Sequence, residues 1–236
     1  MSRISDLDRL YALLDRLEAA VGGKRRLADC TGHVDWPERG VYFFFASDET
    51  RDATDQLRLT RVGTHAVSSG SGTTLWNRLR THRGANRGSY EGGGNHRGSV
   101  FRKHVGRALI ERDGLGDEYP HWGEGSTADR ERRLEELGHE RRVSEYVRDL
   151  PFLWVDLDDE PGPESDRAYV ERNAIALVSN YEKAGIDARS DEWLGRSSPR
   201  GKIAASGLWN VDHVEERYDT AFLDQLTEAV GDTSGL

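Results

Sequence analysis

The stretch Gly40-Val41-Tyr42-Phe43-Phe44-Phe45-Ala46 is a short apolar and aromatic run in a chain of 236 residues. A run of this length, rich in aromatic and β-branched side chains, predicts a buried β-strand. Residues 57–65 alternate between two sets of side chains, which predicts a second strand, and the polar, turn-rich residues 47–56 connect the two. We therefore expect a hairpin with a long tip at the centre of the fold.

Working outward from this hairpin, apolar spacing and capping residues predict the other elements. Helices are expected at residues 4–21, 75–83, 99–112, 165–183 and 220–230, an exposed charged helix within 127–149, and a third strand at 151–157. The sum is an α/β (α+β) fold with a small three-stranded mixed sheet flanked by helices. We expect an N-terminal helical segment (1–39), a central domain (40–182) with a basic glycine-rich insertion (84–98), and a C-terminal helical extension (183–236) packed on the same domain.

Composition excludes several classes of protein. The chain has no run of about 18 apolar residues and no apolar core near its N-terminus, so we expect a cytoplasmic protein without a membrane span. A single cysteine, Cys30, excludes an internal disulfide and a cysteine-rich zinc site. The hydrophobic fraction of 36% is sufficient to fill a core.

The net charge of -9 hides an uneven distribution. Residues 58–112 contain eleven basic and two acidic residues, a balance of +9, which leaves -18 for the remainder. Half of the eight histidines also lie in this segment. One interpretation is a surface that meets a phosphate backbone beside a metal ion. The other is an ordinary basic face that the acidic remainder neutralises.

Three ionisable residues fall on helix faces that should point to the core. Arg78 and His82 share one face of the predicted helix 75–83, and Glu171 lies within the apolar arc of the helix 165–183. A carboxylate in that position must be protonated, paired or bound to a cation. A buried ion pair between Arg78 and Glu171, with His82 as a packing residue, is the alternative to a functional site.

These residues resemble the GIY-YIG nuclease superfamily. The similarity rests on Gly40-Val41-Tyr42 in the first strand, Arg61-Val62-Gly63 in the second, Arg78 and His82 on the next helix, and Glu171 in Glu171-Arg172-Asn173-Ala174-Ile175. The four elements occur in the order of the family and cover about residues 40–181.

The resemblance implies an endonuclease that hydrolyses phosphodiester bonds with Mg²⁺ or Mn²⁺, with DNA as the expected substrate and RNA as the alternative. Glu171 matches the metal-binding glutamate, and Arg78 the arginine that holds the scissile phosphate. Tyr42 matches the tyrosine that orients or deprotonates the attacking water. His82 resembles a histidine of restriction-type members, which orients the tyrosine or shares in proton transfer.

The resemblance and the charge map also indicate supporting residues. Gly40, Gly63 and Asn180 are expected to support the site, Asn180 as the asparagine that follows the family glutamate. Nucleic-acid contacts are expected from Arg61, His65, Arg83, His96, Arg97, Arg102 and Lys103. The glycine-rich loop at 84–98 either closes over DNA or only solvates a long connection.

The chain also departs from the family pattern. Arg61 replaces the usual tyrosine of the second motif, and only His65 offers a substitute for the lost hydroxyl. Because Tyr42, Arg78 and Glu171 are retained, we favour an active enzyme. The alternative is an inactive module of the same fold that binds nucleic acid or a partner. The sequence does not indicate the recognised nucleic-acid structure, the pathway or the oligomeric state.

Overall fold

The computed structural model describes residues 2–52 and 54–233. Its centre is a four-stranded antiparallel sheet of β1 (Arg25–Arg26), β2 (Gly40–Thr50), β3 (Leu57–Gly63) and β4 (Pro151–Asp156), in the order β1-β4-β2-β3. The α+β class is confirmed. The expectation of three strands in a mixed sheet was wrong, because the short β1 adds an edge and all described pairs are antiparallel.

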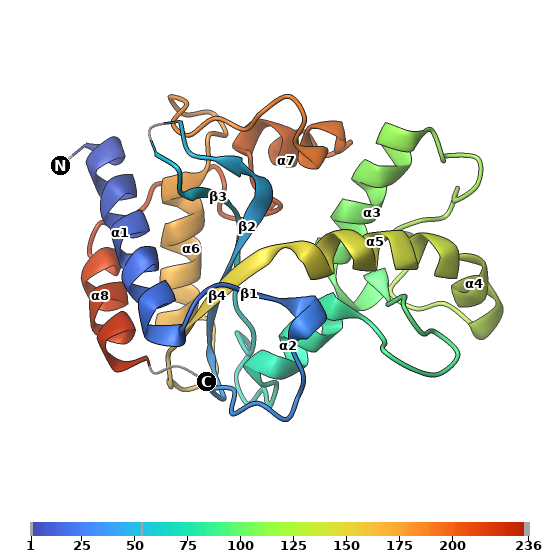
Figure 1. Cartoon of the computed structure of the whole chain (residues 1–236), viewed down its shortest axis with the longest axis horizontal. Coiled ribbons are helices and arrows are strands. Elements are labelled where there is room, and N and C mark those ends of the chain that lie inside the picture. Colours follow the sequence, from blue (N-terminus) through green and yellow to red (C-terminus); the bar gives the residue numbers. More distant parts are fainter. Residues whose placement is uncertain (1, 53, 234–236) are drawn as a thin grey trace.

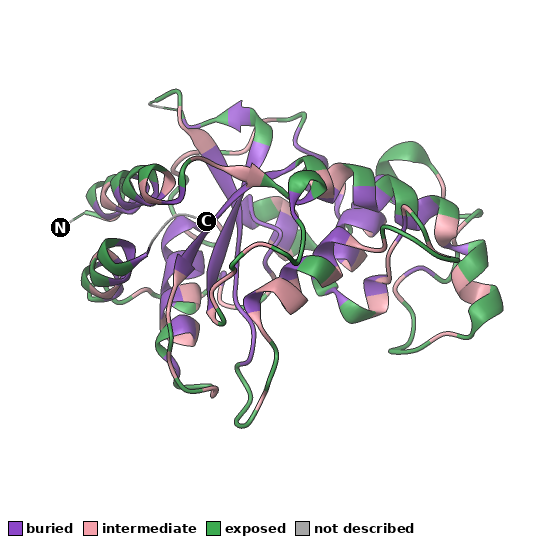
Figure 2. Ribbon diagram, turned by 60° about the horizontal axis from the view of Figure 1, so that its bottom comes forward, coloured by how far each residue is buried: buried purple, intermediate pink, exposed green. Residues whose placement is uncertain are grey.

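The hairpin of β2 and β3 fixes which side chains share a face of the sheet. Tyr42 lies opposite Gly63 on β3 and opposite Trp154 on β4, while Phe44 lies opposite Arg61. Residues directly opposite one another in an antiparallel pair point to the same side. Tyr42 and Arg61 therefore project from one face, and the strands are buried on both faces (Figure 2).

Three helices cover the other face of the sheet: α1 (Arg3–Val21), α6 (Asp166–Val178) and α8 (Phe222–Asp232) (Figure 1). The helix predicted for 165–183 ends at Val178. Arg3 of α1 satisfies carbonyls exposed at this end, because its guanidinium donates to Leu177 at 2.9 Å and to Ser179 at 2.5 Å.

A second group of helices lies on the Tyr42 side of the sheet: α2 (Leu75–Arg83), α3 (Val100–Asp113), α4 (Arg130–Glu135) and α5 (Leu137–Asp149) (Figure 1). The expectation of one exposed helix in 127–149 was wrong. The segment forms two helices, and α5 buries His139, Glu140 and Val143 against the neighbouring helices. The remaining short elements are η1 (Leu27–Asp29), η2 (His96–Gly98), η3 (Leu194–Ser197) and α7 (Gly201–Ser206).

The C-terminal segment closes the free edge of β3. Trp209 donates its backbone N–H to the Thr60 carbonyl at 2.7 Å. The Asn210 side chain accepts from the Val62 N–H at 3.2 Å and donates to the Val62 carbonyl at 2.8 Å. These bonds occupy backbone groups that an edge strand would otherwise leave open.

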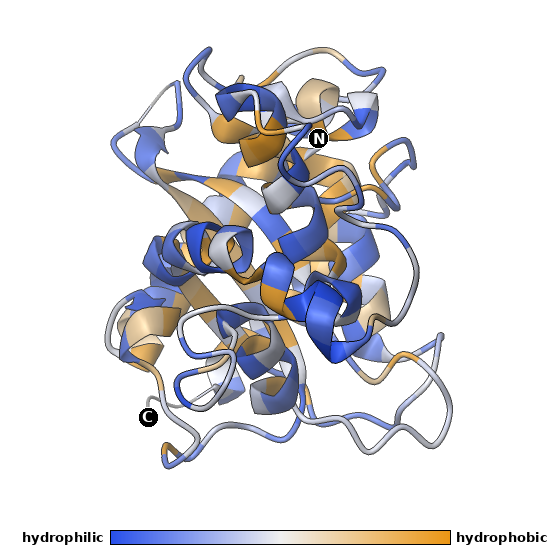
Figure 3. Cartoon of the chain, turned by 90° about the vertical axis from the view of Figure 1, so that its right-hand side faces the viewer, coloured by the Kyte–Doolittle hydropathy of each residue, from blue (hydrophilic) through white to orange (hydrophobic). Residues whose placement is uncertain are grey.

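Apolar residues concentrate on the strands and on the helix faces turned toward them (Figure 3). Within the described residues, none of the helices has both the length and the apolar character that crossing a bilayer requires.

Candidate active site

The Tyr42 hydroxyl is the centre of a buried hydrogen-bonded chain. It lies 2.9 Å from Nε2 of His82, whose Nδ1 lies 2.8 Å from the Ser99 hydroxyl. Tyr42 and His82 are both fully buried. Gly63 is required beneath this tyrosine, because a Cβ at that position would collide with the Tyr42 hydroxyl.

His82 is a neutral imidazole at ordinary pH. Burial, followed by the charges of Arg78, Arg61 and Arg102, lowers its pKa well below the usual value. Both ring nitrogens are next to a hydroxyl, so a proton can pass between Tyr42 and Ser99 through the ring. The arrangement can orient the Tyr42 hydroxyl and exchange a proton with it.

Arg78 lies one turn before His82 on α2 and is half-buried. The ionisable hydroxyl of the adjacent Tyr42 is the main cause that raises the pKa of the guanidinium, through electrostatics and hydrogen bonding. Glu171 contributes in the same direction, while burial opposes both. Among the described residues, Arg78 and Glu171 form no ion pair, and Nε of Arg78 is buried without a hydrogen-bond partner. The alternative of a closed Arg78–Glu171 pair is therefore not what the structure contains.

Glu171 of α6 lies at the end of β3, where one carboxylate oxygen accepts from the Thr64 N–H at 3.1 Å. The residue as a whole is half-buried. Its carboxylate is largely removed from water, and this burial raises the pKa, against the opposing effects of Arg61 and the Thr64 bond.

The donor set around Glu171 fits a hard divalent cation that retains water. The part of the chain that the structure describes has no group of three or more histidine, cysteine, aspartate or glutamate side chains able to hold a metal. Mg²⁺ commonly takes one or two carboxylates and completes its shell with waters and substrate phosphate oxygens. A carboxylate whose ionised form is disfavoured by burial also gains from a cation beside it.

Arg61, in place of the second-motif tyrosine, extends into the same region. Its guanidinium donates to the Trp209 carbonyl at 3.3 Å and lies over the Phe101 ring at 4.8 Å. Its charge lowers the pKa of both Glu171 and His82. Its Nε is buried and finds no partner among the described residues.

His65 connects the end of β3 to α2. Its Nδ1 donates to the Thr73 carbonyl at 2.8 Å, which leaves Nε2 as a buried acceptor without a partner in the described residues. Burial, together with the charges of Arg167 and Arg78, lowers its pKa to about 4. The imidazole is therefore neutral at pH 7.

Most of the other basic residues expected to contact nucleic acid have partners within the protein. Arg97 forms a bidentate pair with Glu136 at 2.6 and 2.8 Å, and Arg102 pairs with Glu140 at 2.5 Å. His96 contacts the same Glu140 at 3.0 Å, Arg83 is buried and donates to the Cys30 carbonyl at 2.5 Å, and Lys103 is half-buried on α3. Buried guanidinium groups need such acceptors. Much of the excess positive charge is thus neutralised internally.

The glycine-rich loop at 84–98 is packed rather than open at several of its glycines. A Cβ at Gly84 would meet the Gly93 carbonyl, and a Cβ at Gly94 would meet the Arg102 guanidinium. Arg148 of α5 donates to the Arg83 carbonyl at 2.8 Å and to the Ala85 carbonyl at 3.0 Å, which fixes the start of the loop.

The two remaining supporting residues lie in different places. Gly40 permits the close pairing of β2 with β4, because a Cβ there would collide with the Val155 carbonyl. Asn180 holds a turn after α6, since its amide bonds both the N–H and the carbonyl of Ile186, at 3.0 and 2.9 Å. Its side-chain oxygen also accepts from Arg3 at 3.2 Å, and none of these partners belongs to the cluster around Tyr42.

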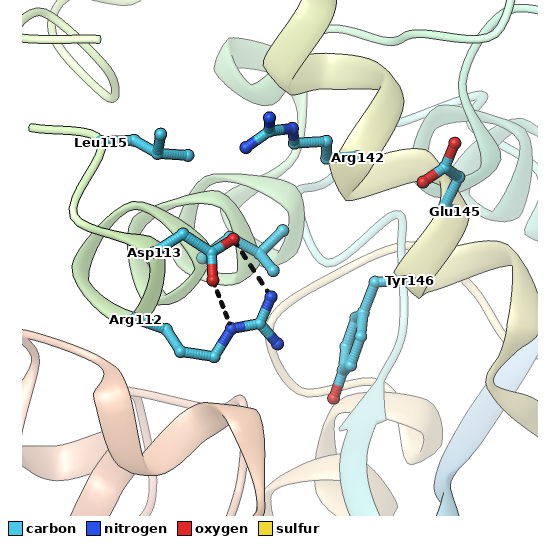
Figure 4. Close-up of a pocket in the computed structure, with 7 residues that line it drawn as sticks. Arg112, Asp113, Leu115, Arg142, Glu145 and Tyr146 are labelled. Carbon is cyan, nitrogen blue, oxygen red and sulfur yellow. Dashed lines mark hydrogen bonds and ion pairs between the residues drawn. The ribbon is translucent and has the colours of Figure 1, made fainter. Parts of the chain in front are cut away.

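Two cavities differ in their chemistry. One of about 590 Å³ lies between α3 and α5, where Arg112 pairs with Asp113 (Figure 4). None of the candidate residues lines it. The other, of about 520 Å³, is lined by Glu171, Arg172 and His213 among others. The second cavity is the candidate site because it contains the candidate metal ligand.

The structure adds three residues that the sequence did not single out as site residues. The backbone N–H of Thr64 donates to Glu171, and the Asn210 side chain bonds the backbone of β3. His213 lines the same cavity as Glu171. The first acts through a backbone N–H, and the other two lie about 40 residues beyond Glu171 in turns without a periodic pattern. No local sequence signal marks any of them.

Comparison with known proteins gives one finding. A family model described as a GIY-YIG domain matches residues 1–236. No curated protein and no solved structure matches the chain.

Proposed function

Because the chain belongs to the GIY-YIG domain family, which has a nuclease-type function in general, we propose that it is a metal-dependent endonuclease that hydrolyses phosphodiester bonds in DNA. The arrangement around Tyr42 and Glu171 supports this proposal. Its residues offer the three things that the reaction requires: a group that orients water, cations for the phosphate and a carboxylate for a metal.

One observation carries the proposal. Two guanidinium groups, Arg61 and Arg78, act electrostatically on Glu171 and each retains a buried Nε–H without an acceptor in the described residues. An unmatched buried donor costs free energy, which an acceptor on a ligand would recover; Arg83 also has such a donor, so the position of Arg61 and Arg78 near Glu171 is what distinguishes these two. A phosphate oxyanion is the acceptor that guanidinium groups match best.

In this proposal Tyr42 orients the attacking water, which reaches the fully buried hydroxyl only when substrate binding opens the cluster. Its hydroxyl is held by His82, and the cation of Arg78 lies beside it. The neutral His82 ring orients that hydroxyl, and Ser99 fixes the ring through its other nitrogen. Arg78 then faces the charge that develops on the phosphate.

Glu171 is the residue that would hold Mg²⁺ or Mn²⁺, with its second carboxylate oxygen and water-filled positions. A bound divalent ion supplies Lewis-acid stabilisation of the phosphate oxygens. The Thr64 N–H fixes the orientation of the carboxylate toward the cavity.

Incubation of the purified chain with supercoiled plasmid and Mg²⁺ or Mn²⁺ tests the proposal. We expect nicking that Glu171→Gln abolishes, while Glu164→Gln, which removes the same charge from the same cavity wall, keeps most activity. The Gln variant should fold normally, because burial disfavours the ionised form of Glu171 and an amide oxygen can still accept from Thr64. Undiminished nicking by a folded Glu171→Gln variant contradicts the assignment.

The replacement of the second-motif tyrosine by Arg61 favours the alternative of an inactive binding module. That alternative predicts salt-sensitive binding of nucleic acid that survives Glu171→Gln, without cleavage in any metal. Parallel assays on DNA and RNA of the same sequence identify the substrate.

A further inference from the structure

His213 shares a cavity with Glu171, although the two residues come from distant parts of the chain. His213 belongs to the C-terminal segment that follows Asn210, which is fixed to β3 through Val62. Tyr42, Arg78 and His82 do not line this cavity. Glu171 therefore lines an open cavity together with His213, and it acts on the Tyr42 cluster through its electrostatic effect on Arg78.

The backbone and the side chain of His213 are both held in place. Its φ of 65° is in the left-handed region, which residues other than glycine adopt at a cost. Its Nδ1 lies 2.7 Å from a carboxylate oxygen of Glu216, so Nδ1 carries a hydrogen and the charged form of the ring has a counterion. With 35% of its side chain exposed, the ring is accessible to both substrate and solvent.

Phosphodiester hydrolysis places the attacking and the leaving oxygen roughly in line, on opposite sides of phosphorus. Tyr42 does not line the cavity and His213 does, so a phosphate held at Glu171 with the water on the Tyr42 side would turn its leaving sugar oxygen toward the cavity. We propose that His213 is a catalytic residue, whose Nε2–H gives its proton to the leaving oxygen. This inference rests on the proposed nuclease function.

Water forms the new phosphorus–oxygen bond and loses its proton on the Tyr42 side, while the bond between phosphorus and the leaving oxygen breaks. The electron pair of that bond stays on the oxygen, which takes the proton from His213. The imidazole then regains a proton from solvent through the cavity.

The test uses an oligonucleotide substrate in which sulfur replaces the leaving oxygen, after the product ends have shown which sugar oxygen departs. A thiolate leaves without protonation, so such a substrate does not need the acid. We expect His213→Asn to slow cleavage of the ordinary substrate by about 10²-fold or more, the usual contribution of a general acid. On the sulfur substrate, in the same metal and buffer, it should match the unaltered chain within about threefold.

Asparagine is chosen because it tolerates the left-handed conformation at this position. His121→Asn is the matched control, since His121 makes the same kind of contact with Glu124, at 2.9 Å, away from the cavity. A folded His213→Asn variant that cuts the ordinary substrate normally, or that is equally slow on both substrates, overturns the role of His213 and leaves the nuclease function standing. Failure of the unaltered chain to cut either substrate in any metal overturns both proposals.

Discussion

Replacement of Tyr42 by phenylalanine removes one buried oxygen atom and tests both the stability and the chemistry of the cluster. The hydroxyl and its partner His82 are fully buried and 2.9 Å apart, so no water can replace the lost bond without rearrangement. A buried polar atom left without its partner costs about 1–3 kcal/mol. In a chain of this size each kcal/mol lowers Tm by about 2–4 °C.

Thermal unfolding followed by circular dichroism, together with the nicking assay below Tm, measures the two effects. We expect Tyr42→Phe to lower Tm by the amount above and to reduce nicking by about 10²-fold or more, as loss of a proton-transferring group does. Tyr11→Phe is the matched control, because Tyr11 is equally buried and its hydroxyl accepts from the Leu59 N–H at 2.8 Å, far along the strand from the site. Tyr11→Phe should lose a similar amount of stability and keep its activity.

Two outcomes refute this reasoning. A Tyr42→Phe variant as stable as the unaltered chain means that the bond to His82 contributes no net stability. Unchanged nicking by a folded variant means that the Tyr42 hydroxyl has no part in the reaction.

Two further perturbations test neighbouring parts of the site. Gly63→Ala places a methyl group against the Tyr42 hydroxyl, so we expect a stability loss of about 1–3 kcal/mol and at least tenfold slower nicking. The control Gly116→Ala adds its methyl group in open space and should change neither quantity. Normal nicking by Gly63→Ala would show that the position of the Tyr42 hydroxyl is unimportant. Urea unfolding should show stability falling as the pH drops from about 6.5 toward 4, because His65 and His104, with pKa values lowered by burial to about 4 and about 3, stay neutral in the folded chain while the unfolded chain binds protons. At pH 5 each histidine should lower the free energy of unfolding by about 2 kcal/mol. This pH lies about 1.5 units below the ordinary histidine pKa, and each unit corresponds to about 1.36 kcal/mol. The raised pKa of Glu171 opposes this trend, so the slope is measured in Glu171→Gln, and a flat profile there would contradict the burial of the two rings as neutral groups.

The sequence was sufficient for the main elements and for naming the four residues of the proposed site. Periodicity placed the helices 4–21, 75–83 and 99–112 close to α1, α2 and α3, because their apolar faces are regular and their caps are local. The same periodicity put Arg78 and His82 on one face of a helix, and Tyr42 on a strand that could only be buried. These are properties of neighbouring residues in the chain.

Only the tertiary structure shows which positive charges are free to bind a phosphate and which are paired within the protein. Positive charge between residues 58 and 112 indicated a phosphate-facing surface, but Arg97 and Arg102 are paired with Glu136 and Glu140 of the distant α5 segment. A charge count along the chain cannot find such pairs, because a buried ion pair depends on which helices pack together. For the same reason the sequence does not reveal Thr64 and His213. Thr64 bonds Glu171 at the end of β3, and His213 lines the same cavity as Glu171. The sequence by itself placed Tyr42, Arg78, His82 and Glu171 at core-facing positions, because strand and helix faces follow from local periodicity. The packing of distant elements decided which groups surround them.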